Sequence, residues 1–505
     1  MLARVGTHAL RLLVAFIPSL LVVTILHFRY DTNIYEHVPI WNDEVGYWHQ
    51  AATFAAVGFQ GGYYALDENP APAAWTRFDV HGPWYPMIYG TIGRLLGEWE
   101  LYTPVVINLL LYTLAACVFI YTVQPNFVQL VVMGLILASA HPILLYLPTA
   151  MSEGLQASVA LLIAAIFWRL LSRRDQVKLW EIILYGCFLW LATVMRLSWG
   201  ILLLPFFLLA FPFTPRGVVR ALLVTGITAT LAYGMVAWVT PGISNHSVLS
   251  TLGAFRISFD SGLQALIDRF SGNWERYFSP RKHPVDVLLT QQFAVVTGII
   301  AVSLASKVAN KIRKTPQISH VSHLIFNLYN LVVVLVSSFF LYIMGTFGDY
   351  RVIGIHLLVT LMLLVTFRHY LAPLAFAVMT LLGWRAVANG GYDFLTTRFN
   401  ALPTVQAIHI PEQVIAYDPD APSPWCNTLV LEIPLYTADA TRIPAGIGLS
   451  WVGQLRVSHI KSRYVWLTDD SINQGLIESL RLDLVPLFDM PQGAIYLNKA
   501  SSCPS

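Results

Sequence analysis

The chain has 505 residues, of which 56% are hydrophobic and only 12% are charged, and its formal net charge is +3. Soluble domains contain about 25% charged residues, so this composition excludes an ordinary soluble globular protein. A net charge so close to zero gives no support for a nucleic-acid partner. The mean hydropathy of +0.60 points to an integral membrane protein.

Apolar segments of membrane-spanning length recur through residues 1–388. The first follows Arg4 and Arg11, and no small-residue cleavage site comes after it, which favours an uncleaved helix over a removed signal peptide. A spanning helix needs about 20 mostly apolar residues, and by this length the sequence predicts about eleven helices. They lie near residues 9–28, 103–123, 127–147, 151–171, 180–196, 198–213, 218–239, 286–306, 323–346, 351–367 and 370–388.

The positions of the basic residues predict how these helices are oriented. With a cytoplasmic N-terminus, the short cytoplasmic loops hold most of the short-loop positive charge, as the positive-inside rule requires. Three regions then lie outside: a first loop at 29–102, a second at 240–285, and a C-terminal region at 389–505. The basic residues of the predicted cytoplasmic loops are Arg173, Arg174, Lys178, Arg216, Arg220, Lys307, Lys311, Arg313, Lys314 and Arg368.

The C-terminal region differs in character from the rest of the chain. Segments such as TLVLEIPLY and RYVWLTDD are short, rich in β-branched and aromatic residues, and bounded by Pro, Gly or Asp. This pattern predicts strands, and therefore a small α/β or mostly β domain. Cys426 and Cys503 both fall here. They could form a disulfide in an oxidising compartment, and the sequence leaves both states open.

Two adjacent carboxylates, Asp43 and Glu44, open the first outside loop in the stretch WNDEVGYWHQ. Apolar residues follow at helical spacing from Val45 to Ala55, which is typical of a helix lying along the membrane surface. Asn42 or Asp43 can cap this helix, because such side chains satisfy the free N–H groups of a first turn. A carboxylate at the membrane boundary can also take a proton from a hydroxyl acceptor. The two roles are compatible.

The segment HGPWYPMIYGTIGRLLG, residues 81–97, is too short to cross a bilayer. We expect a second helix at the membrane–water interface, because aromatic rings such as those of Trp84 and Tyr85 are enriched at this depth. His81 is a candidate partner for a phosphate or hydroxyl group, although a histidine in a loop is more often simply solvated.

Ionisable residues mark the predicted outer ends of several spans, namely Glu153, Arg196, Asp349 and Arg351. Charges inside a span are costly and suggest function. Charges near a helix end can instead extend to the interface, which is the simpler explanation. The predicted topology puts all four on the same side as Asp43, and this convergence favours a shared outward-facing cavity.

The motifs NDEVGYWHQAA, HGPWYPMIYGTIGRLLGEWE, MRLSWGILLLP and DYRVIGIHLLV follow one another in this order along residues 1–388. Together they resemble the GT-C superfamily of integral membrane glycosyltransferases, such as protein O-mannosyltransferases and the bacterial transferases that add aminoarabinose to lipid A. Two positions depart from the family pattern. The family often has Lys or Pro where this chain has His81-Gly82, and commonly reads Arg-Tyr where this chain has Tyr350-Arg351.

The resemblance implies transfer of a hexosyl or pentosyl group from a polyprenyl-phosphate donor to a hydroxyl of a glycan, lipid or protein. Asp43 would be the base, supported by Glu44, in a single displacement that inverts the anomeric centre. Arg351, and behind it Arg196 and His81, would bind the donor phosphate as negative charge grows on it. The further substrate-binding residues that we expect are Glu153, Asp349, Tyr350, Trp84 and Tyr85.

No cofactor is expected, because the sequence has neither a Gly-rich phosphate loop nor a Cys/His zinc spacing. Binding of a divalent cation by Asp43 and Glu44 stays an alternative, since paired carboxylates can bind one. The resemblance also implies a multi-pass protein of the bacterial inner membrane that acts in the cell envelope. Its N-terminus would be cytoplasmic and its C-terminal domain periplasmic.

Three other functions compete with this hypothesis. A transporter or flippase of lipid-linked sugars would favour two repeated halves with broken helices at the bilayer midplane, and the sequence has no matching halves. A glycan polymerase or ligase would place its large loops late in the chain. A membrane scaffold that only presents the C-terminal domain would leave the charges at the outer helix ends unexplained.

Overall fold

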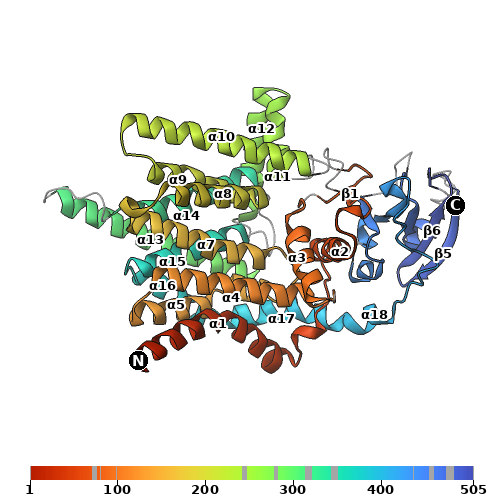
Figure 1. Ribbon diagram of the computed structural model, residues 1–505, viewed down its shortest axis with the longest axis horizontal. Coiled ribbons are helices and arrows are strands. Elements are labelled where there is room, and N and C mark those ends of the chain that lie inside the picture. Colours follow the sequence, from red (N-terminus) through yellow and green to blue (C-terminus); the bar gives the residue numbers. More distant parts are fainter. Residues whose placement is uncertain are drawn as a thin grey trace.

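The computed structural model describes residues 2–503 except 71–76, 80, 98, 241–246, 278–282, 313–320, 343–350, 436, 454–459 and 474–482. A bundle of long helices makes up most of the molecule, and a smaller sheet region lies at one end of it, beside the helices of the predicted first outside loop (Figure 1). This arrangement confirms the predicted class, a polytopic α-helical membrane protein with a small C-terminal α/β domain.

Six helices in the described part of the chain are long and apolar enough to cross a membrane. They are α1 (Leu2–Tyr30), α4 (Thr103–Val123), α7 (Glu153–Ser172), α10 (Pro215–Val239), α13 (Pro284–Ile312) and α14 (Ser322–Leu341). The segment that contains α16 (Leu371–Leu382) and α17 (Trp384–Asn400) counts as a seventh if its 62° bend is taken as part of one span. Shorter apolar helices are α5 (Phe127–Ser139), α8 (Leu179–Met195), the segment Leu197–Ala210 that ends with α9 (Leu203–Ala210), and α15 (Arg351–Thr366).

Every predicted span falls on one or more of these helices, but the predicted count of eleven spanning helices is not confirmed. The span predicted at 127–147 is divided, since α5 ends at Ser139 and the short helix α6 (His141–Tyr146) follows it. Pro142 lies in the first turn of α6, where its missing N–H is tolerated, whereas inside a continuous helix it would remove a hydrogen bond. Pro142 thus divides the predicted span into two helices, an effect that hydropathy alone does not reveal.

The core of the bundle is α7, which packs between α4 and α15. Nearly the whole surface of α7 and α15 is buried, and aliphatic residues such as Leu161, Ile163 and Met362 are fully enclosed. α1 covers one side of the core, and α10 lies on the opposite side of the molecule (Figure 1). The start of α7 and the start of α15 therefore have fixed positions relative to each other.

The sheet region has six strands in the order β1-β3-β2-β4-β6-β5. Strand β2 lies between β3 and β4 and is parallel to both, while β6 runs antiparallel to β4 and β5. The edge strand β1 comes from the first outside loop and pairs with β3, so that Ala65 lies opposite Ser450. The strands are β1 (Ala65–Leu66), β2 (Thr428–Glu432), β3 (Gly448–Val452), β4 (Tyr464–Leu467), β5 (Leu484–Met490) and β6 (Gly493–Asn498).

The sheet region is not divided from the bundle at residue 389. α17 passes through this position, and the short helix α18 (Leu402–Ala407) continues towards the sheet (Figure 1). The first loop and the C-terminal region thus form one outer assembly. The remaining helices are α11 (Ser247–Gly253) and α12 (Phe259–Tyr277), from the second long loop, and α19 (Asp469–Asn473), beside β6.

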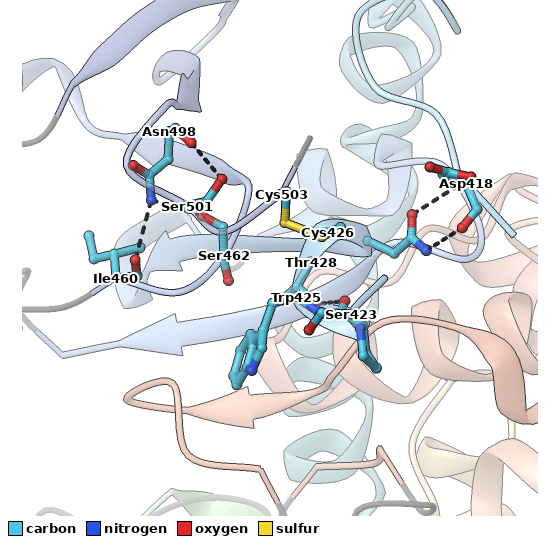
Figure 2. The surroundings of a disulfide bond; sticks show 12 residues. Asp418, Ser423, Trp425, Cys426, Thr428, Ile460, Ser462, Asn498, Ser501 and Cys503 are labelled. Atoms are coloured by element: carbon cyan, nitrogen blue, oxygen red, sulfur yellow. Dashed lines mark hydrogen bonds between the residues drawn. A yellow bond between two sulfur atoms is a disulfide. The ribbon is translucent and has the colours of Figure 1, made fainter. Parts of the chain in front are cut away.

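A disulfide joins Cys426, in the turn before β2, to Cys503, after β6, with their Cα atoms 5.5 Å apart (Figure 2). Asn498 is fixed beside it, because its side-chain amide donates to the carbonyls of Ile460 and Ser462 at 3.3 and 3.1 Å. The two cysteines are 77 positions apart, and strands β2 to β6 lie between them in the chain. Of the two states that the sequence left open, the structure has the paired one.

Two helices of the predicted first outside loop, α2 (Asn42–Val57) and α3 (Trp84–Leu96), lie between the bundle and the sheet (Figure 1). They pack closely where Gly90 faces α2, since a Cβ at this position would lie 2.8 Å from the carbonyl oxygen of Ala51. On its other side α2 is hydrogen-bonded to the C-terminal region, where His49 Nε2 lies 2.9 Å from the carbonyl oxygen of Ile443. α2 is therefore held from both sides.

Candidate functional site

A cavity of about 440 Å³, here called the outer cavity, lies beneath α2 and α3 at one end of the bundle. The start of α7, the end of α8, the end of α10 and the start of α15 all meet there. Part of its wall is apolar, with Leu155, Val194 and Val236. Seven of the residues predicted from the sequence line it: Asp43, His81, Trp84, Tyr85, Glu153, Arg196 and Arg351.

The charged groups of the outer cavity form a chain of alternating sign. His81 Nε2 lies 3.6 Å from Asp43 Oδ1, and Arg351 Nη2 lies 3.5 Å from Asp43 Oδ2. Glu153 Oε1 then joins two arginines, at 3.3 Å from Arg351 Nε and 3.0 Å from Arg196 Nη1. The order is His81, Asp43, Arg351, Glu153, Arg196. The chain thus ends in a basic group on both sides.

Exposure differs along this chain. The Asp43 side chain is 31% exposed and that of Arg351 is 23% exposed, whereas Glu153 is only 5% exposed. Asp43 and Arg351 can therefore both meet a ligand, and Glu153 lies behind them. This placement gives Glu153 the role of holding the two arginines. The fold thus brings charged side chains of α2, α7 and α15 into contact at a position that is accessible to water.

Burial alone would raise the pKa of Asp43, but the nearby positive charges of His81 and Arg351 outweigh it and hold this pKa below its usual range. Burial would lower the pKa of His81, yet Asp79 and Asp43 raise it instead. Asp79 is itself fixed, because Gln50 Nε2 donates to its carboxylate at 2.6 Å. Asp43 is therefore ionised, and the imidazole of His81 beside it keeps its proton to a higher pH than an ordinary histidine does.

Tyr47 and Gln156 also line the outer cavity, and sequence reasoning missed both. Tyr47 comes one helical turn after Asp43, and its ring centroid lies 4.8 Å from that of His81. The spacing of four residues was the available signal. Gln156 is held by Trp199, whose indole N–H donates to Gln156 Oε1 at 2.7 Å. Both residues offer polar groups to a ligand.

The start of α7, which carries Glu153, is fixed by a buried asparagine of α4. Asn108 Nδ2 donates to the carbonyls of Leu147 and Thr149 at 3.2 and 2.7 Å, and the hydroxyl of Tyr89 donates to Asn108 Oδ1. A Cβ on Gly154 would lie 2.3 Å from that same oxygen. Only glycine allows α7 to begin so close to α4.

Glu44 points away from the outer cavity and is completely buried. It forms a two-point ion pair with Arg398 of α17, at 2.8 Å from Nη2 and 3.2 Å from Nε. It also accepts from the backbone N–H of Ala150 at 3.2 Å, and His37 Nε2 lies 3.7 Å away. One carboxylate thus connects the start of α2, the segment before α7, and α17. This position makes Glu44 an anchor of the site rather than a group that meets substrate.

Burial raises the pKa of Glu44, but the charge of Arg398 and the neighbouring His37 imidazole outweigh it and bring this pKa to about 2. Arg398 is itself fully buried, with its guanidinium 4.8 Å from the ring centroid of Trp41 and 4.2 Å from that of Phe394. Sequence reasoning missed Arg398, and no local signal could have found it, because 354 positions separate it from Glu44.

The prediction that Asn42 or Asp43 caps α2 is wrong. The N-cap residue is Trp41, and Asn42 and Asp43 already belong to the helix. Glu44, in the third helical position, reaches back towards the backbone N–H of Trp41 at 3.4 Å, as in one half of a capping box. The helix starts one residue earlier than expected, which leaves the Asp43 carboxylate available to the outer cavity.

Two of the predicted residues, Asp349 and Tyr350, lie outside the described residues. Within the described ranges, no group of three or more His, Cys, Asp or Glu side chains is arranged to hold a metal ion. Asp43 and Glu44 do not converge, since one lines the outer cavity and the other is paired inside the protein. Two carboxylates that point apart cannot serve as joint ligands of one cation.

Two solved structures are similar to this chain, and both are of ArnT from Cupriavidus metallidurans. The apo structure has 13% sequence identity and a TM-score of 0.38, and the match covers 98% of each chain. The structure bound to undecaprenyl phosphate has 13% identity and a TM-score of 0.40, and the match covers 99% of each chain. No protein-family model and no curated protein matches the chain.

Proposed function

We propose that this protein is a membrane glycosyltransferase that moves a sugar from a polyprenyl-phosphate donor to a hydroxyl acceptor at the outer cavity. The observation that carries the proposal is the contact between Asp43 and Arg351, 3.5 Å apart at the mouth of several membrane helices. It pairs a carboxylate that can receive a proton with a cation that can bind a departing phosphate.

Arg351 and Arg196 support the phosphate half of the reaction. A guanidinium has five N–H donors in a fixed plane, so each arginine can keep its bond to Glu153 and still donate to a phosphate. Negative charge grows on the phosphate oxygen as the sugar departs. Donors already aimed at this oxygen stabilise that charge more than they stabilise the bound donor, and this difference lowers the barrier.

Asp43 supports the acceptor half of the reaction. A carboxylate with a lowered pKa is always ionised at neutral pH, but it is a weak base. It can therefore accept the hydroxyl proton only once the sugar–phosphate bond is largely broken and the anomeric carbon is electron-poor. The oxygen of the acceptor attacks from the face opposite the phosphate, and one such displacement inverts the anomeric centre. The acceptor, a glycan, lipid or protein, stays open.

The apolar wall of the outer cavity fits a donor with a lipid tail. Leu155 and Val194 come from α7 and α8, and Val236 comes from α10. An isoprenoid chain between these helices would leave its phosphate among Arg196 and Arg351. We propose that this end of the bundle faces the periplasm of a bacterial inner membrane, as the distribution of basic residues predicts.

Replacing Arg351 by alanine tests the phosphate half. The probe is undecaprenyl phosphate, the lipid bound in the second ArnT structure. We expect the dissociation constant measured with the purified full-length protein to rise at least about tenfold, because charge-assisted hydrogen bonds contribute roughly 1.5–3 kcal/mol. Arg94→Ala, on the exposed side of α3, is the matched control and should bind as the unaltered protein does. Unchanged binding by Arg351→Ala would contradict the assignment.

The raised pKa of His81 predicts a pH dependence of donor binding. The charge of His81 is complete below its ordinary pKa of 6.5 and is lost as the pH rises through the higher value in the folded protein. Binding of undecaprenyl phosphate should weaken over this range by roughly fivefold relative to His81→Gln, since a partly exposed ionic contact contributes about 1 kcal/mol. The comparison with the variant cancels the titration of the phosphate itself. Parallel pH profiles of the two proteins would rule out a role for His81.

A further inference from the structure

The connection between α15 and α16 has an arginine in a backbone conformation that favours glycine. Arg368 has a φ of 62°, in the left-handed region. Its N–H donates to the carbonyl of Val365 at 3.0 Å, and the N–H of His369 donates to that of Leu364 at 2.8 Å. These two bonds form a Schellman motif, whose left-handed position is usually a glycine because a Cβ is strained there. An arginine in this position suggests that its side chain has a use.

Arg368 stands at the mouth of a second cavity, of about 220 Å³, here called the inner pocket. Much of its wall is aliphatic and comes from four helices, with Ile300 of α13, Leu324 of α14, Leu364 of α15 and Leu371 of α16. Ser303 and Tyr370 add hydroxyl groups to the lining. The inner pocket is therefore a slot between helices that has aliphatic walls on several sides and an arginine beside it.

A second cation lies beside this entrance. Lys307 Nζ, near the end of α13, lies 3.1 Å from His369 Nε2. A lysine donates, so the imidazole nitrogen must accept, and His369 is neutral in this contact. His369 itself lines the inner pocket. No carboxylate is found among the described residues that line it. The polar end of the inner pocket thus has an excess of positive charge.

The inner pocket lies at the opposite end of α15 from the outer cavity. α15 begins with Arg351, at the outer cavity, and has 16 residues, which span about 24 Å. This length is close to the hydrocarbon thickness of a bilayer, about 30 Å. Arg368 and Lys307 therefore lie near the other membrane interface, where the headgroups of the second leaflet are found. The aliphatic walls lie at the depth of acyl chains.

We propose that the inner pocket binds one anionic phospholipid of the leaflet opposite the outer cavity. An acyl chain would lie between α13, α14 and α16, and the phosphate would meet Arg368, with Lys307 close by. Basic pockets between membrane helices recognise anionic headgroups by this combination of charge and apolar wall. A zwitterionic lipid would leave the excess positive charge without a partner. The proposal does not depend on the proposed transfer reaction.

Lipid binding by the purified full-length protein tests the proposal. Native mass spectrometry in detergent would count the retained molecules of dioleoylphosphatidylglycerol and of dioleoylphosphatidylcholine. We expect one tightly retained phosphatidylglycerol per chain and a preference for it over phosphatidylcholine. Arg368→Gly and Lys307→Gln should each reduce this preference about fivefold, the effect of one basic residue near an anionic headgroup. Inorganic phosphate alone should not raise the unfolding temperature.

Arg368→Gly keeps the test independent of folding. Glycine takes a φ of 62° without strain, so the unfolding temperature in lipid-free detergent should stay the same or rise while the lipid preference falls. The control is the double variant Arg216→Gln and Arg220→Gln. These exposed residues lie at the start of α10, whose other end lines the outer cavity. Equal retention of the two lipids, an unchanged preference in Arg368→Gly, or stabilisation by phosphate alone would each overturn the proposal.

Discussion

Replacing Asp43 by asparagine should abolish sugar transfer and leave the protein folded. The variant keeps the shape of the side chain but removes the charge that would accept the hydroxyl proton. General-base catalysis contributes roughly 10²- to 10⁴-fold, so we expect the turnover rate with a polyprenyl-phosphate sugar to fall by at least about 10². The measurement is transfer from a panel of such donors, followed by separation of the products.

Binding of undecaprenyl phosphate distinguishes a lost base from a damaged site. Asp43 pairs with Arg351 and repels a phosphate, so Asp43→Asn should bind the lipid as well as or better than the unaltered protein. Asp67→Asn, in the same outside loop but not in the lining of the outer cavity, is the control and should keep full transfer activity. Full activity in Asp43→Asn would remove the base from the mechanism. Activity lost together with lipid binding would show that Asp43 only organises the site.

Replacing Arg398 by glutamine should destabilise the outer assembly by about 3–5 kcal/mol, because it leaves the buried charge of Glu44 without its partner. The two side chains are completely enclosed, so water cannot take over the role of the guanidinium. We expect a lower unfolding temperature and weaker transfer, since Glu44 holds the start of α2 and the segment before α7. The measurement is thermal unfolding of the purified protein alongside its activity.

A double variant separates the charge from the loss of contacts. Glu44→Gln combined with Arg398→Gln removes both charges, and we expect it to recover a large part of the stability that Arg398→Gln alone has lost. Arg385→Gln, on the exposed surface of α17, should have little effect. If Arg398→Gln unfolds at the temperature of the unaltered protein, the ion pair is not an anchor of the site.

The predicted part of the candidate site rested on topology. The positive-inside rule and the lengths of the apolar segments put Asp43, Glu153, Arg196 and Arg351 on one side of the membrane. The described structure brings these four residues to one cavity. The four residues could be expected to lie near one another because a spanning helix fixes the depth of its ends. Two residues at helix ends on the same side of the membrane then lie at similar depth, and only their positions in the plane of the membrane are undetermined.

The same reasoning could not distinguish the two members of the acidic pair. Asp43 and Glu44 are neighbours, and consecutive side chains on a helix point about 100° apart. Which of them faces the ligand depends on the rotation of α2 about its axis. That rotation is set by the pairing of Glu44 with Arg398 and by the close contact at Gly90. Neither contact is visible in a local stretch of sequence.

By itself, the sequence determined that the protein crosses a membrane many times, where its helices lie and which loops are structured outside the bundle. Hydropathy and turn chemistry act over short stretches, so these features can be read locally. Only the tertiary structure decided that β1 of the first loop completes the C-terminal sheet, that Glu44 is an anchor rather than a joint ligand, and that Arg398 is its partner. These contacts join residues hundreds of positions apart, and their energy depends on burial that only the folded chain provides.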